Sequence, residues 1–78
     1  MKTELFSRVV LTRDVLEEGL RTGDVGTVVE IYEDISGKAT GYELELFAAN
    51  GDTLAVASVP ADVVRPAAHN DRLAARVG

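Results

Sequence analysis

Three glutamates in segments of alternating polarity are the residues of this chain with the clearest potential for chemistry. Glu43 and Glu45 lie two positions apart, so in a strand their side chains share one face, about 7 Å from each other. Paired carboxylates can carry out acid–base catalysis or bind a hard cation. Nothing in the sequence indicates a cleft around them. The simplest interpretation is a solvated strand face. The alternative is that they form, with Glu30, an electronegative strip that binds basic residues of a partner.

The other residue types that build catalytic or metal centres are too few here. His69 is the only histidine and there is no cysteine, so a zinc site lacks its usual ligands. A Ser-His-Asp triad would need His69 to fold back onto a serine far away in the chain. The glycine turn at residues 23–26 lacks the Lys-Ser/Thr pair of a phosphate-binding loop. We expect no catalytic residue, no metal and no cofactor, and therefore a protein that is not an enzyme.

The net charge restricts the classes of partner. Thirteen acidic and eight basic residues give a charge of −5, which opposes nucleic-acid binding because phosphates are neutralised by clustered Lys and Arg. The same charge opposes an anionic membrane surface, and no apolar run approaches the roughly 20 residues of a membrane-spanning helix. With no cysteine and no apolar leader after Met1, we expect a cytoplasmic protein.

Short segments of alternating polarity predict that β-strands carry these side chains. The longest segment follows a turn bracketed by Gly23 and Gly26, where we expect positive φ or a close approach to another strand. It runs over residues 25–33, and strict alternation places Val29 and Ile31 in the core. Four further strands are expected, over residues 6–13, 42–47 and 53–59 and near residues 64–66.

The same alternation assigns core positions in the other strands. The side chains expected to point inward are Val9, Leu11, Tyr42, Leu44, Leu46, Leu54, Val56 and Val64, whereas Val10 is expected to point outward or to cover an end of the barrel. The connection over residues 14–22 is expected to form one helical turn, with Asp14 as its N-cap and Gly19 at its end.

Five short strands, a long first connection and a 3₁₀ turn before the last strand predict an all-β fold, a small SH3-like barrel. Closure would hide the strand edges, whereas an unclosed edge would allow a homodimer. We expect the barrel domain to occupy residues 1–66. Residues 67–78 are expected to form a loose tail that is frayed or a short helix.

Two surfaces of such a barrel are expected to bind a partner. One is the long first connection, because binding residues concentrate on loops that a rigid scaffold positions. The other is the outward face of the sheet, where two aromatic side chains would add apolar contact beside the carboxylates. The predicted partner-binding residues are Leu16, Glu17, Glu18, Leu20, Glu30, Tyr32, Glu43, Glu45 and Phe47.

Several motifs together resemble one family of small bacterial proteins. They are Val-Val-Leu-Thr-Arg-Asp at residues 9–14, Gly-Leu at 19–20, Gly-Asp-Val-Gly-Thr-Val-Val at 23–29, Tyr-Glu-Leu-Glu at 42–45, Asn-Gly at 50–51 and Asp-Val-Val-Arg-Pro at 62–66. The family is known as domain of unknown function 4926, and the resemblance covers most of residues 6–66. Residues 23–29 are also similar to the KOW motif of ribosomal and transcription-elongation proteins.

The family resemblance implies a small stand-alone accessory protein and transfers no catalytic residue. Genes of this class often lie beside a partner gene, in toxin–antitoxin or immunity-like arrangements. Together with the acidic composition, this predicts a non-catalytic module that binds one protein partner, a basic one encoded nearby. A KOW-like nucleic-acid or ribosome-associated module is the alternative.

Overall fold

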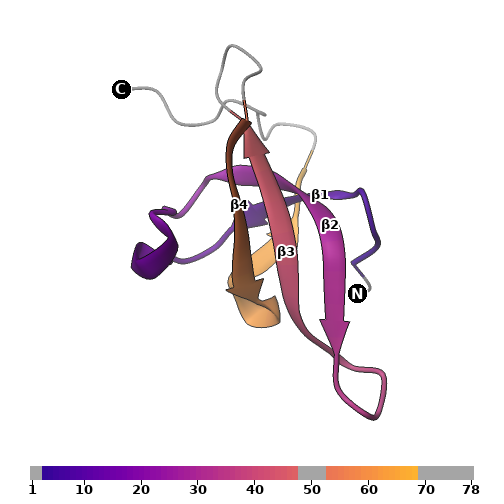
Figure 1. Ribbon diagram of the computed structural model, residues 1–78. Helices are drawn as coiled ribbons and strands as arrows, with labels where there is room; N and C mark the ends of the chain where they lie inside the picture. The colour runs from indigo at the N-terminus through magenta and orange to yellow at the C-terminus, as the bar shows by residue number, and fades with distance from the viewer. Residues whose placement is uncertain (1–2, 48–52, 69–78) are drawn as a thin grey trace.

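The computed structural model describes residues 3–47 and 53–68, and it confirms the all-β class (Figure 1). Five strands form one antiparallel sheet in the order β4-β3-β2-β1-β5. The strands are β1 (Arg8–Leu11), β2 (Val25–Glu33), β3 (Ala39–Phe47), β4 (Thr53–Pro60) and β5 (Val64–Pro66). The predicted Asn-Gly turn and the tail from His69 onward lie outside the described residues.

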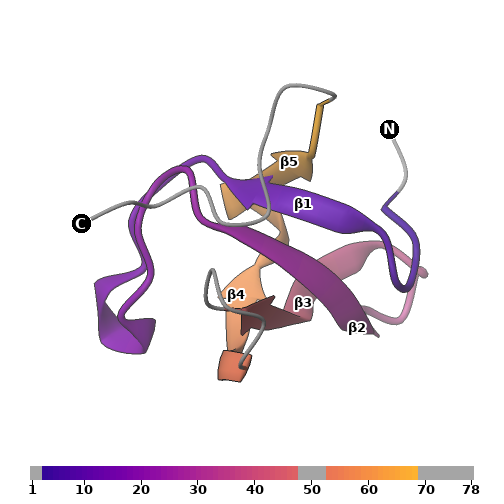
Figure 2. The same cartoon turned by 90° about the horizontal axis from the view of Figure 1, so that it is seen from above.

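Two single-turn 3₁₀ helices complete the described elements. The helix η1 (Leu16–Glu18) lies in the β1–β2 connection, and η2 (Ala61–Val63) directly precedes β5, as predicted. The sheet curls, so that β2 runs obliquely between β1 and β5 on one side and β3 and β4 on the other (Figure 2). Within the described residues no pairing joins β4 to β5, so the sheet is not closed. No helix in this part of the chain has the length and apolarity to cross a membrane.

A β-bulge in β2 changes which face each residue occupies. Val28 lies opposite Leu44 and Glu30 lies opposite Glu43, which leaves Val29 as the extra residue. Val28 is therefore in the core at 0% exposure. The prediction that Val29 faces the core is wrong, because strict alternation does not account for an inserted residue. After the bulge Ile31 packs against the core, as predicted.

The core face of β4 is also shifted by one residue from the prediction. Ala57 lies opposite Leu44 and Val59 opposite Tyr42, and both are buried. Val56, predicted to point inward, is 52% exposed. Both faces of this strand carry small apolar residues, so the pairing with β3 decides the register. The side chain of Leu54 lies outside the described residues.

Two further positions, in β1 and at the start of β5, bear on the predicted core. Val10 is buried but does not belong to the core cluster that contains its neighbours Val9 and Leu11, which agrees with the expectation that it covers an end of the fold from the other face of β1. Val63 of η2 is buried, whereas Val64 is half-buried against the core. The 3₁₀ turn thus anchors the end of the sheet. The buried core cluster comprises Val9, Leu11, Val15, Leu20, Val28, Tyr42, Leu44, Leu46, Ala57, Val59 and Val63.

The two glycines before and within the start of β2 have the roles expected of them. Gly23 has φ +93°, a left-handed conformation that side chains disfavour. At Gly26 an added Cβ would lie 3.3 Å from the Glu45 carbonyl oxygen and 3.3 Å from Leu46 Cγ. The absence of a side chain at Gly26 thus lets β2 bend closely over β3.

Because of the bulge, replacing Val28 or its neighbour Val29 with alanine is expected to lower the free energy of unfolding by unequal amounts. Val28→Ala is expected to lower the free energy of unfolding by about 1–3 kcal/mol, and Val29→Ala by under about 1 kcal/mol. Both variants lose the same two methyl groups and the same strand propensity, so the difference reports burial. Urea denaturation followed by circular dichroism measures both. A larger loss at Val29 would show that β2 alternates without a bulge.

Candidate functional site

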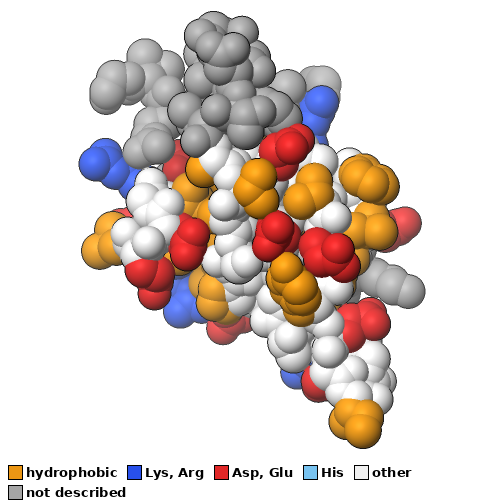
Figure 3. Space-filling view, viewed as in Figure 1, with side chains coloured by type: hydrophobic (Ala, Val, Ile, Leu, Met, Phe, Trp, Pro, Cys, Tyr) orange, Lys and Arg blue, Asp and Glu red, His pale blue; other side chains and the backbone are white. Residues whose placement is uncertain are grey.

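The outer side of β2, β3 and β4 brings the three predicted glutamates together. Glu30 of β2 lies opposite Glu43 of β3, which lies opposite Ser58 of β4. In the neighbouring row Glu45 lies between Thr27 and Val56. We call this surface the acidic face, and its residues are Thr27, Glu30, Tyr32, Glu43, Glu45, Val56 and Ser58. Figure 3 shows acidic side chains gathered there beside exposed hydrophobic ones.

The carboxylates of the acidic face are not neutralised within the described residues. Like charges directly opposite each other in a sheet are destabilising, and Glu30 and Glu43 form such a pair. No described ion pair involves any of the three glutamates. Arg8 lies at the end of one row, where Thr27 separates it from Glu45. This arrangement leaves a surface that a cation can stabilise.

Two hydroxyl groups fix one carboxylate of the acidic face. The Tyr32 hydroxyl donates a hydrogen bond of 2.9 Å to Glu43 Oε1, and the Ser58 hydroxyl donates one of 3.1 Å to the same atom. The hydrogen bond to Glu43 is the main cause that raises the pKa of Tyr32 above 10.0, followed by partial desolvation and the charges of Glu43 and Glu30. Glu43 is thus held as a hydrogen-bond acceptor.

The titration of Tyr32 tests this contact. In Glu43→Gln the pKa of Tyr32 is expected to fall toward 10.0, because the carboxylate charge that favours the protonated phenol is lost. Glu45→Gln, on the same strand and face, is expected to leave that pKa raised. The hydrogen bond from Tyr32 to Glu43 stabilises the folded chain fully below pH 10.0. This stabilisation is lost as the pH rises through the raised pKa that Tyr32 has in the folded state. NMR of ¹³C-labelled tyrosine measures the titration, and equal values in both variants would contradict the contact.

The β1–β2 connection is a loop pinned at the base of η1. Val15 and Leu20 exchange backbone hydrogen bonds of 3.0 Å in both directions, and both side chains are buried. Gly19, with φ +73°, ends the helical turn as predicted. Leu16 is 76% exposed, whereas Leu20 is 5% exposed. The prediction that Leu20 contacts a partner is therefore corrected: it anchors the loop in the core.

Two aspartates brace the stem of this loop. Asp14 was predicted to cap η1, but the N-cap residue is Val15 and it has no side-chain hydrogen bond. Asp14 Oδ1 instead accepts hydrogen bonds from the Thr22 backbone N–H at 2.8 Å and from its hydroxyl at 3.0 Å. These bonds lower the pKa of Asp14 below 3.8. Buried Asp24 accepts a bond of 2.9 Å from the Arg21 N–H. Thus Glu17 and Glu18 are exposed on a braced loop.

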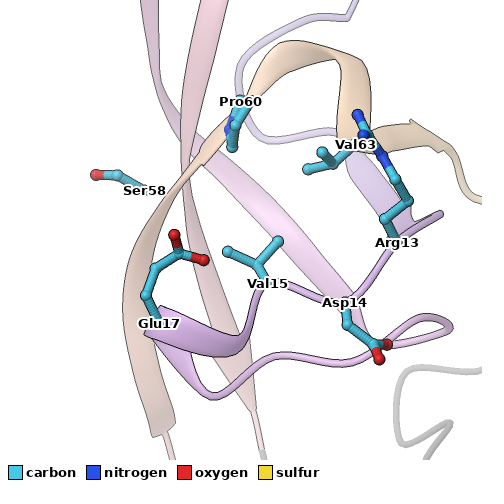
Figure 4. A pocket seen from close by; sticks show the side chains of 7 residues that line it. All are labelled: Arg13, Asp14, Val15, Glu17, Ser58, Pro60 and Val63. Atoms are coloured by element: carbon cyan, nitrogen blue, oxygen red, sulfur yellow. The ribbon is translucent and has the colours of Figure 1, made fainter.

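A pocket of about 220 Å³ lies between this loop and β4 (Figure 4). It is lined by Arg13, Asp14, Val15, Glu17, Ser58, Pro60 and Val63. The Glu17 carboxylate points from η1 toward β4, and the side chains of Val15 and Val63 point into the space between the two elements. Sequence reasoning missed this pocket, because its two sides come from distant segments of the chain, and no local pattern joins them.

The exposed hydrophobic side chains differ from those expected. Tyr32 is exposed on the acidic face as predicted, and Val56 joins it there unexpectedly. The side chain of Phe47 lies outside the described residues. Ile35, at the tip of the β2–β3 hairpin, is fully exposed, and its polar neighbours gave no signal of an apolar site.

Comparison with known families identifies the chain's relatives. A family model described as Domain of unknown function (DUF4926) matches residues 5–66. The chain belongs to this family. The match spans all five strands and both sides of the pocket, and it ends at Pro66, the last residue of β5. No curated protein and no solved structure matches the chain. The family description names no activity.

Proposed function

We propose that this member of the DUF4926 family is a non-catalytic module that binds one basic protein partner through its acidic face and its β1–β2 loop. The observation that supports this most strongly is the row of carboxylates on adjacent strands, with Glu30 directly opposite Glu43 and no neutralising ion pair within the described residues. A partner's Lys or Arg side chains relieve this repulsion on binding, which gives the face a preference for cations.

The fold beneath these surfaces is proposed to be SH3-like. The strand order, the long connection between β1 and β2 and the 3₁₀ turn before β5 support this arrangement. In such a scaffold the first connection lies beside the last long strand and forms part of a binding surface. The loop residues Leu16, Glu17 and Glu18 are exposed there, and Tyr32 and Val56 supply apolar contact next to the carboxylates.

The partner is proposed to be the product of an adjacent gene, as in antitoxin or immunity systems. The supporting argument is the membership of the chain in a family whose description names no activity, together with its acidic face. Co-expression of the tagged chain with the untagged neighbouring product tests this. We expect both to elute together at low salt and to separate as the salt concentration rises. Elution of the tagged chain alone would reject the proposal.

The KOW-like alternative is tested with the same purified chain. The segment at residues 23–29 favours it, whereas the net charge of −5 opposes it. We expect no binding of single-stranded or ribosomal RNA in a titration at low and moderate salt. Tight binding that falls steeply with salt would establish the alternative and displace the proposed protein partner.

A further inference from the structure

We propose that the pocket between the β1–β2 loop and β4 receives one long cationic side chain, Arg or Lys, from the partner. This inference rests on the proposed function, because the side chain belongs to the same basic partner. The pocket would hold one side chain of the partner at a defined position, whereas the acidic face attracts cations only by its overall charge. Three properties of the pocket support it: size, wall chemistry and charge.

The size of the pocket suits one side chain. Sites for free small molecules usually measure about 300–1,000 Å³, and this pocket measures about 220 Å³. Its inner wall is apolar, formed by the buried residues Val15 and Val63 together with Pro60. Arg and Lys bury their aliphatic stems against such walls while the charged head stays at a polar rim.

One carboxylate faces the pocket without a partner among the described residues. The Glu17 carboxylate points into the space and has no hydrogen bond or ion pair within the described residues. The Asp14 carboxylate points away from this space and accepts its two hydrogen bonds from Thr22, so Glu17 supplies the negative charge that faces the pocket. Arg13 is the cation among the lining residues, and Asp62 pairs with it at 3.1 Å. An anionic side chain would therefore be repelled here and a cation attracted.

The pocket and the acidic face lie on either side of β4. Ser58 lines the pocket, and its hydroxyl donates a hydrogen bond to Glu43 on the acidic face. An extended basic segment that crosses β4 can therefore place one side chain in the pocket and its neighbours over Glu43 and Glu45. The pocket would fix the register of that segment, whereas the acidic face adds charge attraction.

An NMR titration of the full chain tests the pocket with defined probes. The capped peptide Gly-Gly-Arg-Gly-Gly is compared with peptides that carry norleucine or glutamate in place of arginine. We expect saturable shifts at Val15, Glu17 and Val63 with the arginine peptide, and none that saturate with the glutamate peptide. The norleucine peptide is expected to bind roughly fivefold or more weakly, because it keeps the aliphatic stem but lacks the charge.

Two matched variants locate the interaction. Glu17→Gln is expected to weaken binding of the arginine peptide roughly fivefold, whereas Glu18→Gln, the neighbouring exposed residue that does not line the pocket, is expected to leave it unchanged. Absence of saturable shifts, or equal weakening by both variants, would overturn the inference. A partner complex that forms but is insensitive to Glu17→Gln would reject the pocket and leave the proposed function standing.

Discussion

Replacing Leu44 with alanine is expected to lower the free energy of unfolding by about 2–5 kcal/mol. Leu44 lies in the middle of β3 at 0% exposure, opposite Val28 on one side and Ala57 on the other. The substitution removes apolar contact and leaves a cavity at the point where the two neighbouring strands meet the core. Because a chain of 78 residues has a small margin of stability, much of the variant is expected to unfold near room temperature.

A second leucine provides the control for this substitution. Leu16 is 76% exposed on η1, so Leu16→Ala is expected to change the free energy of unfolding by no more than about 0.5 kcal/mol. Urea denaturation, followed by circular dichroism, compares both variants with the unmodified chain. Similar losses for Leu16→Ala and Leu44→Ala would contradict the assignment of the core.

Reversing charge on the acidic face is expected to weaken partner binding without lowering the stability of the fold. The double variant Glu30→Lys/Glu45→Lys should weaken partner binding by on the order of tenfold or more, because it turns attraction into repulsion at two positions. The same change places a lysine opposite Glu43 and removes a like-charge pair from the sheet. Its melting temperature is therefore expected to be equal to or above that of the unmodified chain. Calorimetric titration and thermal melts measure both quantities.

The matched control lies on the other side of the same hairpin. Glu33 is exposed and lies opposite Ala39, which packs against the core, so its strand position belongs to the opposite face. Glu33→Lys makes the same change in charge as either single reversal and should alter partner affinity by less than about threefold. Equal weakening by Glu33→Lys and Glu45→Lys would mean that only overall charge matters, and that the acidic face is not the binding surface.

The sequence predicted where the strands lie better than it predicted which residues of each strand face the core. Alternation identified the strands, and the 3₁₀ turn expected before the last strand is present as η2. The error at Val28 and Val29 arises because a bulge depends on the partner strand and leaves no local signature. The prediction for Val56 was wrong for a related reason. Apolar residues occur on both faces of β4, and only the pairing with β3 decides which face turns toward the core.

For the candidate site, too, local sequence patterns predicted some residue positions, whereas contacts between distant segments decided others. Glu43 and Glu45 share a face because of strand geometry, and Glu30, predicted outward, joins them because β2 pairs with β3 so that Glu30 lies opposite Glu43. The loop leucines could not be assigned from sequence, since both suit a core and only the fold buries Leu20 and exposes Leu16. The pocket was missed because Val63 reaches it from a distant segment.

Carboxylate footprinting of the partner complex tests the proposed surface most directly. A carbodiimide reagent labels accessible glutamates, and mass spectrometry compares each residue in the free chain and in the complex. The proposed function predicts that Glu17, Glu30 and Glu45 lose labelling in the complex, while Glu4 and Glu33 keep it. Protection of Glu33 with continued labelling of Glu30 and Glu45 would contradict it and place the partner on the opposite face of the hairpin.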